Sequence, residues 1–221
     1  MVSTLVHLFL LGLPALGATI AMVSAFVSYR SAKSEATART QPNQTPNPML
    51  VFAMFPTALV LFGLALEFIY SGDLGGRLPS SILESGSMAY GIPSLLAGIG
   101  VGIVCLRGVG RVVRDQSLLG RVLVYAIHPL TVAVFGLVMS FMILSRASDW
   151  TGGAQLFIEP AWRASLYVSI GGISAPLSAV LSTSYEQAWR PEGFGRAIVR
   201  STAGETVCII FLLLAFLAIS P

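Results

Sequence analysis

The sequence predicts an all-α membrane protein with six transmembrane helices, arranged as three tandem helical hairpins. The chain is 55% hydrophobic and only 10% charged, whereas ordinary soluble domains carry about 25% charged residues. Six of its apolar stretches are long enough to cross a hydrocarbon core of about 30 Å, which needs about 20 helical residues. An internal repeat then groups these stretches in pairs.

The predicted spans lie at roughly 4–29, 49–70, 89–110, 122–144, 165–185 and 197–219. The first, which contains "LVHLFLLGLPALGA", resembles the apolar part of a secretory leader. It has no basic segment before it, and it matches the start of a later helix, so we interpret it as the first span.

Basic residues are concentrated in alternate loops, after the first, third and fifth spans. These loops and the adjoining helix ends hold ten of the thirteen Lys and Arg residues: Arg30, Lys33, Arg39, Arg107, Arg111, Arg114, Arg121, Arg190, Arg196 and Arg200. Short loops rich in Lys and Arg stay in the cytoplasm. We therefore expect a multi-pass protein with cytoplasmic hairpin loops and both termini on the outer, periplasmic or lumenal, side.

The even-numbered spans share one sequence pattern without gaps. It reads "TALVLFGLALEF" from Thr57, "LTVAVFGLVMSF" from Leu130 and "ETVCIIFLLLAF" from Glu205. Among the odd-numbered spans, "GLPALGATIA" resembles "GIPSLLAGIG", whereas the fifth span matches less well. The repeat predicts hairpins at 1–75, 86–146 and 162–221.

The odd-numbered spans are rich in Gly, Ala and Ser, and the even-numbered ones in Phe, Leu, Ile and Val. Small residues let helix backbones approach closely in lipid. This difference favours a two-layered ring, with the odd helices inside and the even helices facing lipid. Ordinary packing of a glycine-rich membrane protein is the alternative.

Glu205 is a carboxylate in the middle of the sixth span. A charge at this depth costs roughly 2.5–3.5 kcal/mol on insertion scales, so such a residue is a candidate functional site. The alternative is a carboxyl hydrogen-bonded inside a static bundle. The sequence has no metal-ligand cluster, phosphate-binding loop or nucleophile–base pair, so we expect no enzymatic chemistry, no cofactor and no nucleic-acid partner.

The hairpins, the polar loops and the motif "AGETVCIIFLLLAF" resemble the proteolipid (c or K) subunit of V-type and archaeal-type rotary ATPases, here with a triplicated hairpin. The resemblance implies that Glu205 carries the ion and that Thr57 and Leu130 occupy the acid position of the first two hairpins. It also implies a homo-oligomeric rotor ring in lipid, a stator subunit supplying an arginine, stalk subunits contacting the cytoplasmic loops, and ATP chemistry on other subunits. A stand-alone six-helix transporter or scaffold is the alternative.

Thr131 and Thr206 are candidate hydrogen-bond partners of Glu205, and which of them bonds to it is left open. Sodium-carrying relatives have a Thr-Gln pair just after the acid position of a hairpin that lacks the acid. Here the two pairs are Ala58-Leu59 and Thr131-Val132, which favours protons over sodium. His128 lies beside Pro129 at membrane depth and can titrate near neutrality; a neutral, hydrogen-bonded histidine is the alternative.

Overall fold

A computed structural model describes residues 2–37, 48–72, 77–149, 153 and 155–220, and these residues form helices and short turns only. The long helices are α1 (Val2–Thr37), α2 (Pro48–Ser71), α4 (Ser80–Arg114), α5 (Leu119–Asp149), α6 (Ile158–Gly171), α7 (Ser174–Thr183) and α8 (Pro191–Ala218). Short 3-10 turns, Gln116–Leu118 and Glu186–Trp189, precede α5 and α8. The predicted all-α fold is confirmed, while Arg39 lies outside the described residues.

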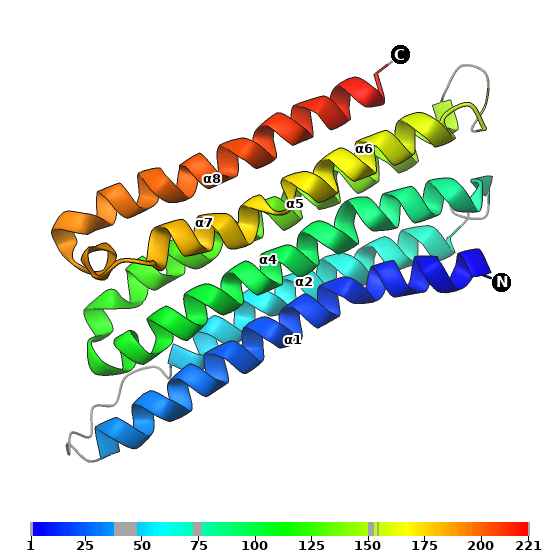
Figure 1. Cartoon of the computed structure of the whole chain (residues 1–221). Coiled ribbons are helices and arrows are strands. Elements are labelled where there is room, and N and C mark those ends of the chain that lie inside the picture. The colour runs from blue at the N-terminus through cyan, green and yellow to red at the C-terminus, as the bar shows by residue number, and fades with distance from the viewer. Residues whose placement is uncertain (1, 38–47, 73–76, 150–152, 154, 221) are drawn as a thin grey trace.

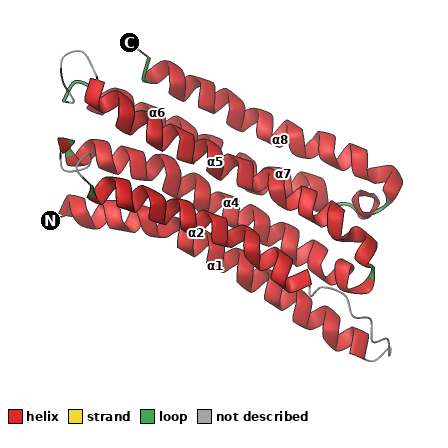
Figure 2. Ribbon diagram, turned by 180° about the vertical axis from the view of Figure 1, so that it is seen from behind, coloured by secondary structure: helices red, strands yellow, loops and turns green. Residues whose placement is uncertain are grey.

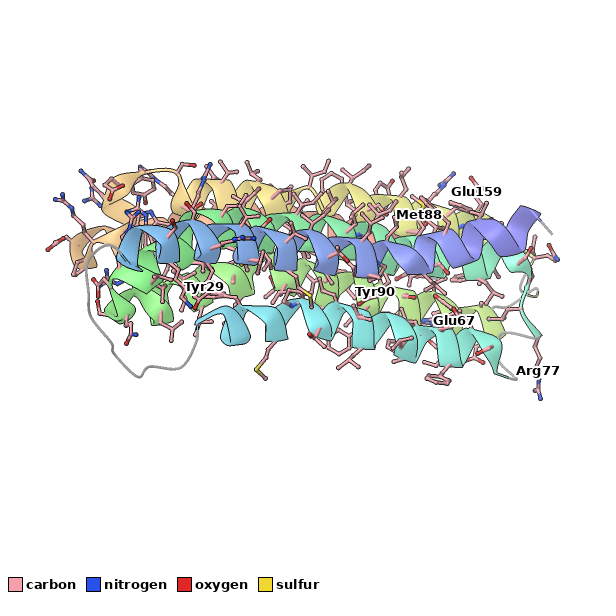
Figure 3. The ribbon with its side chains drawn as sticks, turned by 90° about the horizontal axis from the view of Figure 1, so that it is seen from below. Tyr29, Glu67, Arg77, Met88, Tyr90 and Glu159 are labelled. Carbon is pink, nitrogen blue, oxygen red and sulfur yellow. The ribbon has the colours of Figure 1, made fainter. Side chains whose placement is uncertain are left out.

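The helices form three antiparallel pairs: α1 with α2, α4 with α5, and α6 and α7 together with α8 (Figure 1). Both termini lie at one end of the bundle, and the turns that join α4 to α5 and α7 to α8 lie at the other end (Figure 1). Figure 2 shows the same pairs from the reverse side. In Figure 3, Glu67, Arg77 and Glu159 lie toward the end with the termini, and Tyr29 lies toward the opposite end.

Five helical segments in the described part of the chain are long and apolar enough to cross a membrane. They are Phe9–Ser34, Ser80–Arg114, Gln116–Ala147, Ile158–Thr183 and Pro191–Ala218. The remaining helix, α2, has a shorter apolar part at Pro56–Ser71, but its 24 residues extend about 36 Å at 1.5 Å per residue. The chain is therefore a multi-pass integral membrane protein.

Most helices extend beyond the predicted spans, because hydropathy detects only their apolar middles. The third span, predicted at 89–110, belongs to a helix that begins nine residues earlier at Ser80. The fifth, predicted at 165–185, begins at Ile158 and consists of two helices, α6 and α7.

Pro176 accounts for the break between α6 and α7. A proline has no N–H for the carbonyl four residues before it, which here belongs to Gly172. The Gly172 carbonyl instead accepts from the N–H of Ala175 at 3.0 Å, and the N–H of Ile173 bonds to the Ile170 carbonyl at 3.1 Å. The helix is therefore tightened and interrupted at Gly172 and Ile173, within the membrane.

The first arms of the three hairpins, α1, α4 and the α6–α7 segment, form the inner layer. They pack closely in a row, with α4 between α1 and the α6–α7 segment. Glycines permit the contact: a Cβ added to Gly98 would lie 2.3 Å from the backbone of Gly17, and one added to Gly91 would lie 2.2 Å from the Leu10 carbonyl oxygen. The second arms, α2, α5 and α8, form the outer layer and contact one another much less. The single chain thus has two layers, as expected for a sector of a ring, and the closed ring itself stays a prediction.

The three hairpins pack in the same register. Gly63 of α2 faces Pro14 of α1, with 3.6 Å between its added Cβ and the proline Cγ. The corresponding Gly136 of α5 faces Pro93 of α4 at 3.1 Å. In the third hairpin this position is Phe211, and its partner is Gly171, whose added Cβ would lie 3.0 Å from the Phe211 Cβ. In the third hairpin the large residue of this contact therefore lies on the outer helix and the glycine on the inner helix.

Candidate functional site

Glu205 lies at the midpoint of α8 (Pro191–Ala218), with its side chain only 15% exposed. The buried residues of α8 recur at helical spacing and form one stripe: Gly193, Ala197, Ser201, Gly204, Cys208 and Ala215. This stripe packs α8 against α6 and α7, and Glu205 lies beside it. The carboxyl is therefore turned into the bundle, although its neighbours Thr206 and Val207 are exposed.

Two side chains of α5 contact the same oxygen of this carboxyl. The Thr131 hydroxyl lies 2.8 Å from Glu205 Oε1, and His128 Nδ1 lies 2.9 Å from it. His128 is also 15% exposed, so the pair is largely shielded. These contacts place the carboxyl between the outer helices of the second and third hairpins, within one chain.

The hydrogen count at Thr131 allows two arrangements. Its hydroxyl lies 2.7 Å from the His128 carbonyl oxygen as well as 2.8 Å from Glu205, and it carries one hydrogen. If Thr131 donates to the carbonyl, a protonated Glu205 can donate to Thr131 in turn. If Glu205 is ionised, Thr131 can donate to the carboxylate instead. The same pocket can therefore hydrogen-bond a neutral or a charged carboxyl.

The structure brings Glu205 together with Thr131 but not with Thr206. The Thr206 side chain is exposed, and its hydroxyl bonds to the Thr202 carbonyl at 3.0 Å. Sequence reasoning missed the contact with His128. The available signal was that His128 and Thr131 are three residues apart, so they share one face of a helix.

Arg200 lies on the same helix as Glu205 but is directed elsewhere. Its guanidinium carbon lies 4.5 Å from the centre of the Tyr185 ring, beyond the end of α7, and the residue is exposed. The basic side chain that contacts Glu205 is that of His128, which belongs to α5 and not to α8.

Basic residues hold the turn between α7 and α8 against the second hairpin. Arg111 forms a two-pronged ion pair with Glu186, with both N–O distances 2.6 Å. Arg107 donates to the hydroxyls of Thr183 and Ser184, each at 3.0 Å. The Arg111 guanidinium beside Glu186 holds the pKa of that carboxyl below its usual value of 4.5. At neutral pH the pair is therefore charged, and it joins the second and third hairpins.

These features define a class of protein: a multi-pass helical membrane protein of repeated hairpins with a shielded carboxyl at mid-helix. Residues 85–143, which form most of the α4–α5 hairpin, match the family model for the C subunit of ATP synthase. The chain is also similar to the K subunit of the A-type ATP synthase of Methanocaldococcus jannaschii, with 28% identity over 134 residues. Over these matched regions the chain is similar to c/K proteolipid subunits of ATP synthases.

The matched region covers 58% of this chain and 60% of the Methanocaldococcus jannaschii protein. The family match includes His128 and Thr131 but ends before Glu205. No solved structure matches the chain.

Proposed function

We propose that this chain is a rotor-ring subunit of the membrane sector of an archaeal-type or V-type rotary ATPase, and that Glu205 carries one proton per chain. The observation that carries the proposal is the carboxyl at the midpoint of α8, 15% exposed and bonded to Thr131 and His128. Similarity to the C and K subunits of ATP synthases supports the rotor role.

A proton carrier must cross hydrocarbon in neutral form, because burial disfavours the charged form of a carboxyl. The pocket suits this requirement. A protonated Glu205 can donate to Thr131, which in turn donates to the His128 carbonyl. Facing an aqueous half-channel and an arginine of a stator subunit, the same carboxyl would lose its proton and be held as an ion pair. Rotation of the ring would then carry each carboxyl between two half-channels.

The remaining partners follow from the same proposal. Copies of the chain would close into a ring in lipid, and ATP would be hydrolysed or made on other subunits. The basic ends of α4, α5 and α8 would lie in the cytoplasm and contact the central stalk. Both termini, which share the opposite end of the bundle (Figure 1), would lie on the outer side.

The groups around Glu205 support a proton rather than sodium as the transported ion. A hard cation such as sodium prefers several oxygen ligands. Of the two side-chain atoms that contact Oε1, one is a histidine nitrogen and the other is a hydroxyl oxygen that also bonds a backbone carbonyl. A proton needs only the carboxylate and one acceptor.

Modification by a carboxyl-reactive carbodiimide tests the proposal. We expect the reagent to modify Glu205 selectively in a large, detergent-resistant homo-oligomer, at a rate that sodium does not change. Glu192, an exposed acid in the first turn of α8, is the internal control for reactivity with water-accessible carboxyls. A monomer without selective modification would favour a stand-alone transporter, and protection by sodium would reject proton specificity.

A further inference from the structure

His128 occupies a position that is not histidine in the other two repeats. The repeat aligns the outer helices α2, α5 and α8 on Thr57, Leu130 and Glu205. Two residues earlier, the equivalent residues are Phe55, His128 and Ala203. The imidazole thus occurs only on the outer helix that faces the acid-bearing helix. There its Nδ1 lies 2.9 Å from Glu205 Oε1.

The contact joins two helices whose main packing surfaces lie elsewhere. The main packing surface of α8 lies against α6 and α7, and α5 packs chiefly on α4. The bonds from His128 and Thr131 to Glu205 are the polar contacts described between the two helices at this depth, and they set where the carboxyl points. Because Thr131 also has the His128 carbonyl as an acceptor at 2.7 Å, it can leave Glu205 without losing its hydrogen bond. His128 is the partner with no such alternative among the bonds described at this site.

We propose that His128 is a positioning residue, which holds the Glu205 carboxyl against α5 and away from lipid until the site reaches a half-channel. The proposal rests on the proposed function of Glu205. The imidazole can serve both states of the carboxyl, because Nδ1 can donate to a carboxylate or accept from a protonated carboxyl. The proton itself stays on Glu205, so the positioning needs no proton transfer to His128.

Holding the carboxyl in this way predicts slow reaction with an apolar reagent that arrives through lipid. A reagent such as dicyclohexylcarbodiimide reaches Glu205 only when the carboxyl swings outward. An ordinary hydrogen bond contributes about 0.5–1.5 kcal/mol net, so its loss should raise the modification rate roughly two- to tenfold.

Two substitutions of matched shape test this. His128→Asn places an amide nitrogen or oxygen near the position of Nδ1 and keeps a hydrogen bond to Glu205, but it cannot titrate. His128→Leu has nearly the same shape as the Asn variant and cannot hydrogen-bond. In rings purified from the two variants and from wild type, the rate of Glu205 modification is measured by mass spectrometry at one pH.

We expect the Asn variant to react at nearly the wild-type rate and the Leu variant roughly two- to tenfold faster. Equal rates of Glu205 modification in rings of His128→Asn and His128→Leu would overturn the proposal. This holds whether both rates resemble that of wild type or both are faster. Absence of Glu205 modification in the wild-type ring would instead count against the proposed function. The two failures are therefore distinguishable, and comparing only assembled rings removes effects on folding.

Discussion

Gly204 of α8 meets the backbone of α7 at Ser178: a Cβ added to the glycine would lie 3.0 Å from the Ser178 Cα and 3.2 Å from its nitrogen. This close approach lies one residue before Glu205. The equivalent positions in the first two hairpins are Pro56 and Pro129. In the third hairpin the glycine therefore brings the acid-bearing helix close to its inner partner.

Gly204→Leu should weaken this contact and loosen the ring. A larger side chain must displace backbone atoms of α7, and overpacking of this kind costs about 1–3 kcal/mol. The temperature at which the detergent-purified ring dissociates should fall. Gly195→Leu is the matched control on the same helix, because a Cβ there meets nothing within 4 Å. An equal effect of both substitutions would contradict the packing described here.

Thr131→Val should slow ATP-driven proton pumping without preventing ring assembly. The substitution keeps the shape of the side chain but removes the hydroxyl that lies 2.8 Å from Glu205. Loss of one hydrogen bond of about 0.5–1.5 kcal/mol corresponds to a change of roughly two- to tenfold.

Thr206→Val is the control for Thr131→Val and should pump like wild type, because its hydroxyl is exposed and bonds to Thr202. Thr131→Ser should retain most activity. If Thr206→Val were the slower variant, the assignment of Thr131 to the site would be wrong.

The pair of Arg111 and Glu186 should make the cytoplasmic turn sensitive to acid. The pKa of Glu186 is lowered in the folded protein, so its stabilising contribution is present above the ordinary carboxyl pKa and is lost as pH falls through the lowered one. Because the pair is exposed, we expect a contribution below about 1 kcal/mol. Protease cleavage at the α7–α8 turn, followed from pH 7 to pH 3, should rise at low pH in wild type.

In Glu186→Gln the turn should be cleaved somewhat faster at neutral pH, with less further change on acidification. Glu192→Gln, which removes an exposed acid near the same turn, is the control. Unchanged cleavage in Glu186→Gln at pH 7 would show that the ion pair does not hold the turn.

If Glu205 is the one proton-carrying carboxyl of each chain, as we propose, the ratio of protons to ATP should be low. Each elementary charge that crosses the membrane costs about 2.3 kcal/mol per 100 mV. A ring with fewer carboxyls moves fewer protons per turn, so each ATP can drive them against a steeper gradient. We therefore expect this ring to suit a pump better than a synthase. A proton-to-ATP ratio like that of rings with one acid per hairpin would reject this expectation.

Hydropathy was sufficient to predict the all-α membrane class, whereas the bounds of the hairpins and the role of Glu205 stay predictions. The helix ends were less predictable, because the polar residues near Ser80 continue a helix that hydropathy does not detect. The break at Gly172 and Ile173 follows from Pro176, but the weak match of the fifth span concealed its place in the repeat. Only the packing showed that, in the third hairpin, the outer helix supplies the large residue Phe211 and the inner helix supplies Gly171 at this contact.

The contact between His128 and Glu205 could not be predicted from the sequence. It depends on how α5 and α8 are rotated about their axes and on how far each is shifted along its axis relative to the other. Spacing places His128 and Thr131 on one face of α5, but it does not say which helix that face meets. Thr206 was an equally good candidate by sequence, being adjacent to Glu205. Its position on the outer side of α8 is a result of the packing of Gly204 and Cys208 against the inner helix.

ATP-driven proton pumping by reconstituted membranes containing Glu205→Gln tests the central claim most directly. Glutamine keeps the size and hydrogen-bonding capacity of the neutral carboxyl but cannot release a proton. We predict fully assembled rings and no pumping, with Glu192→Gln pumping like wild type. Coupled pumping by an assembled Glu205→Gln ring would contradict the account.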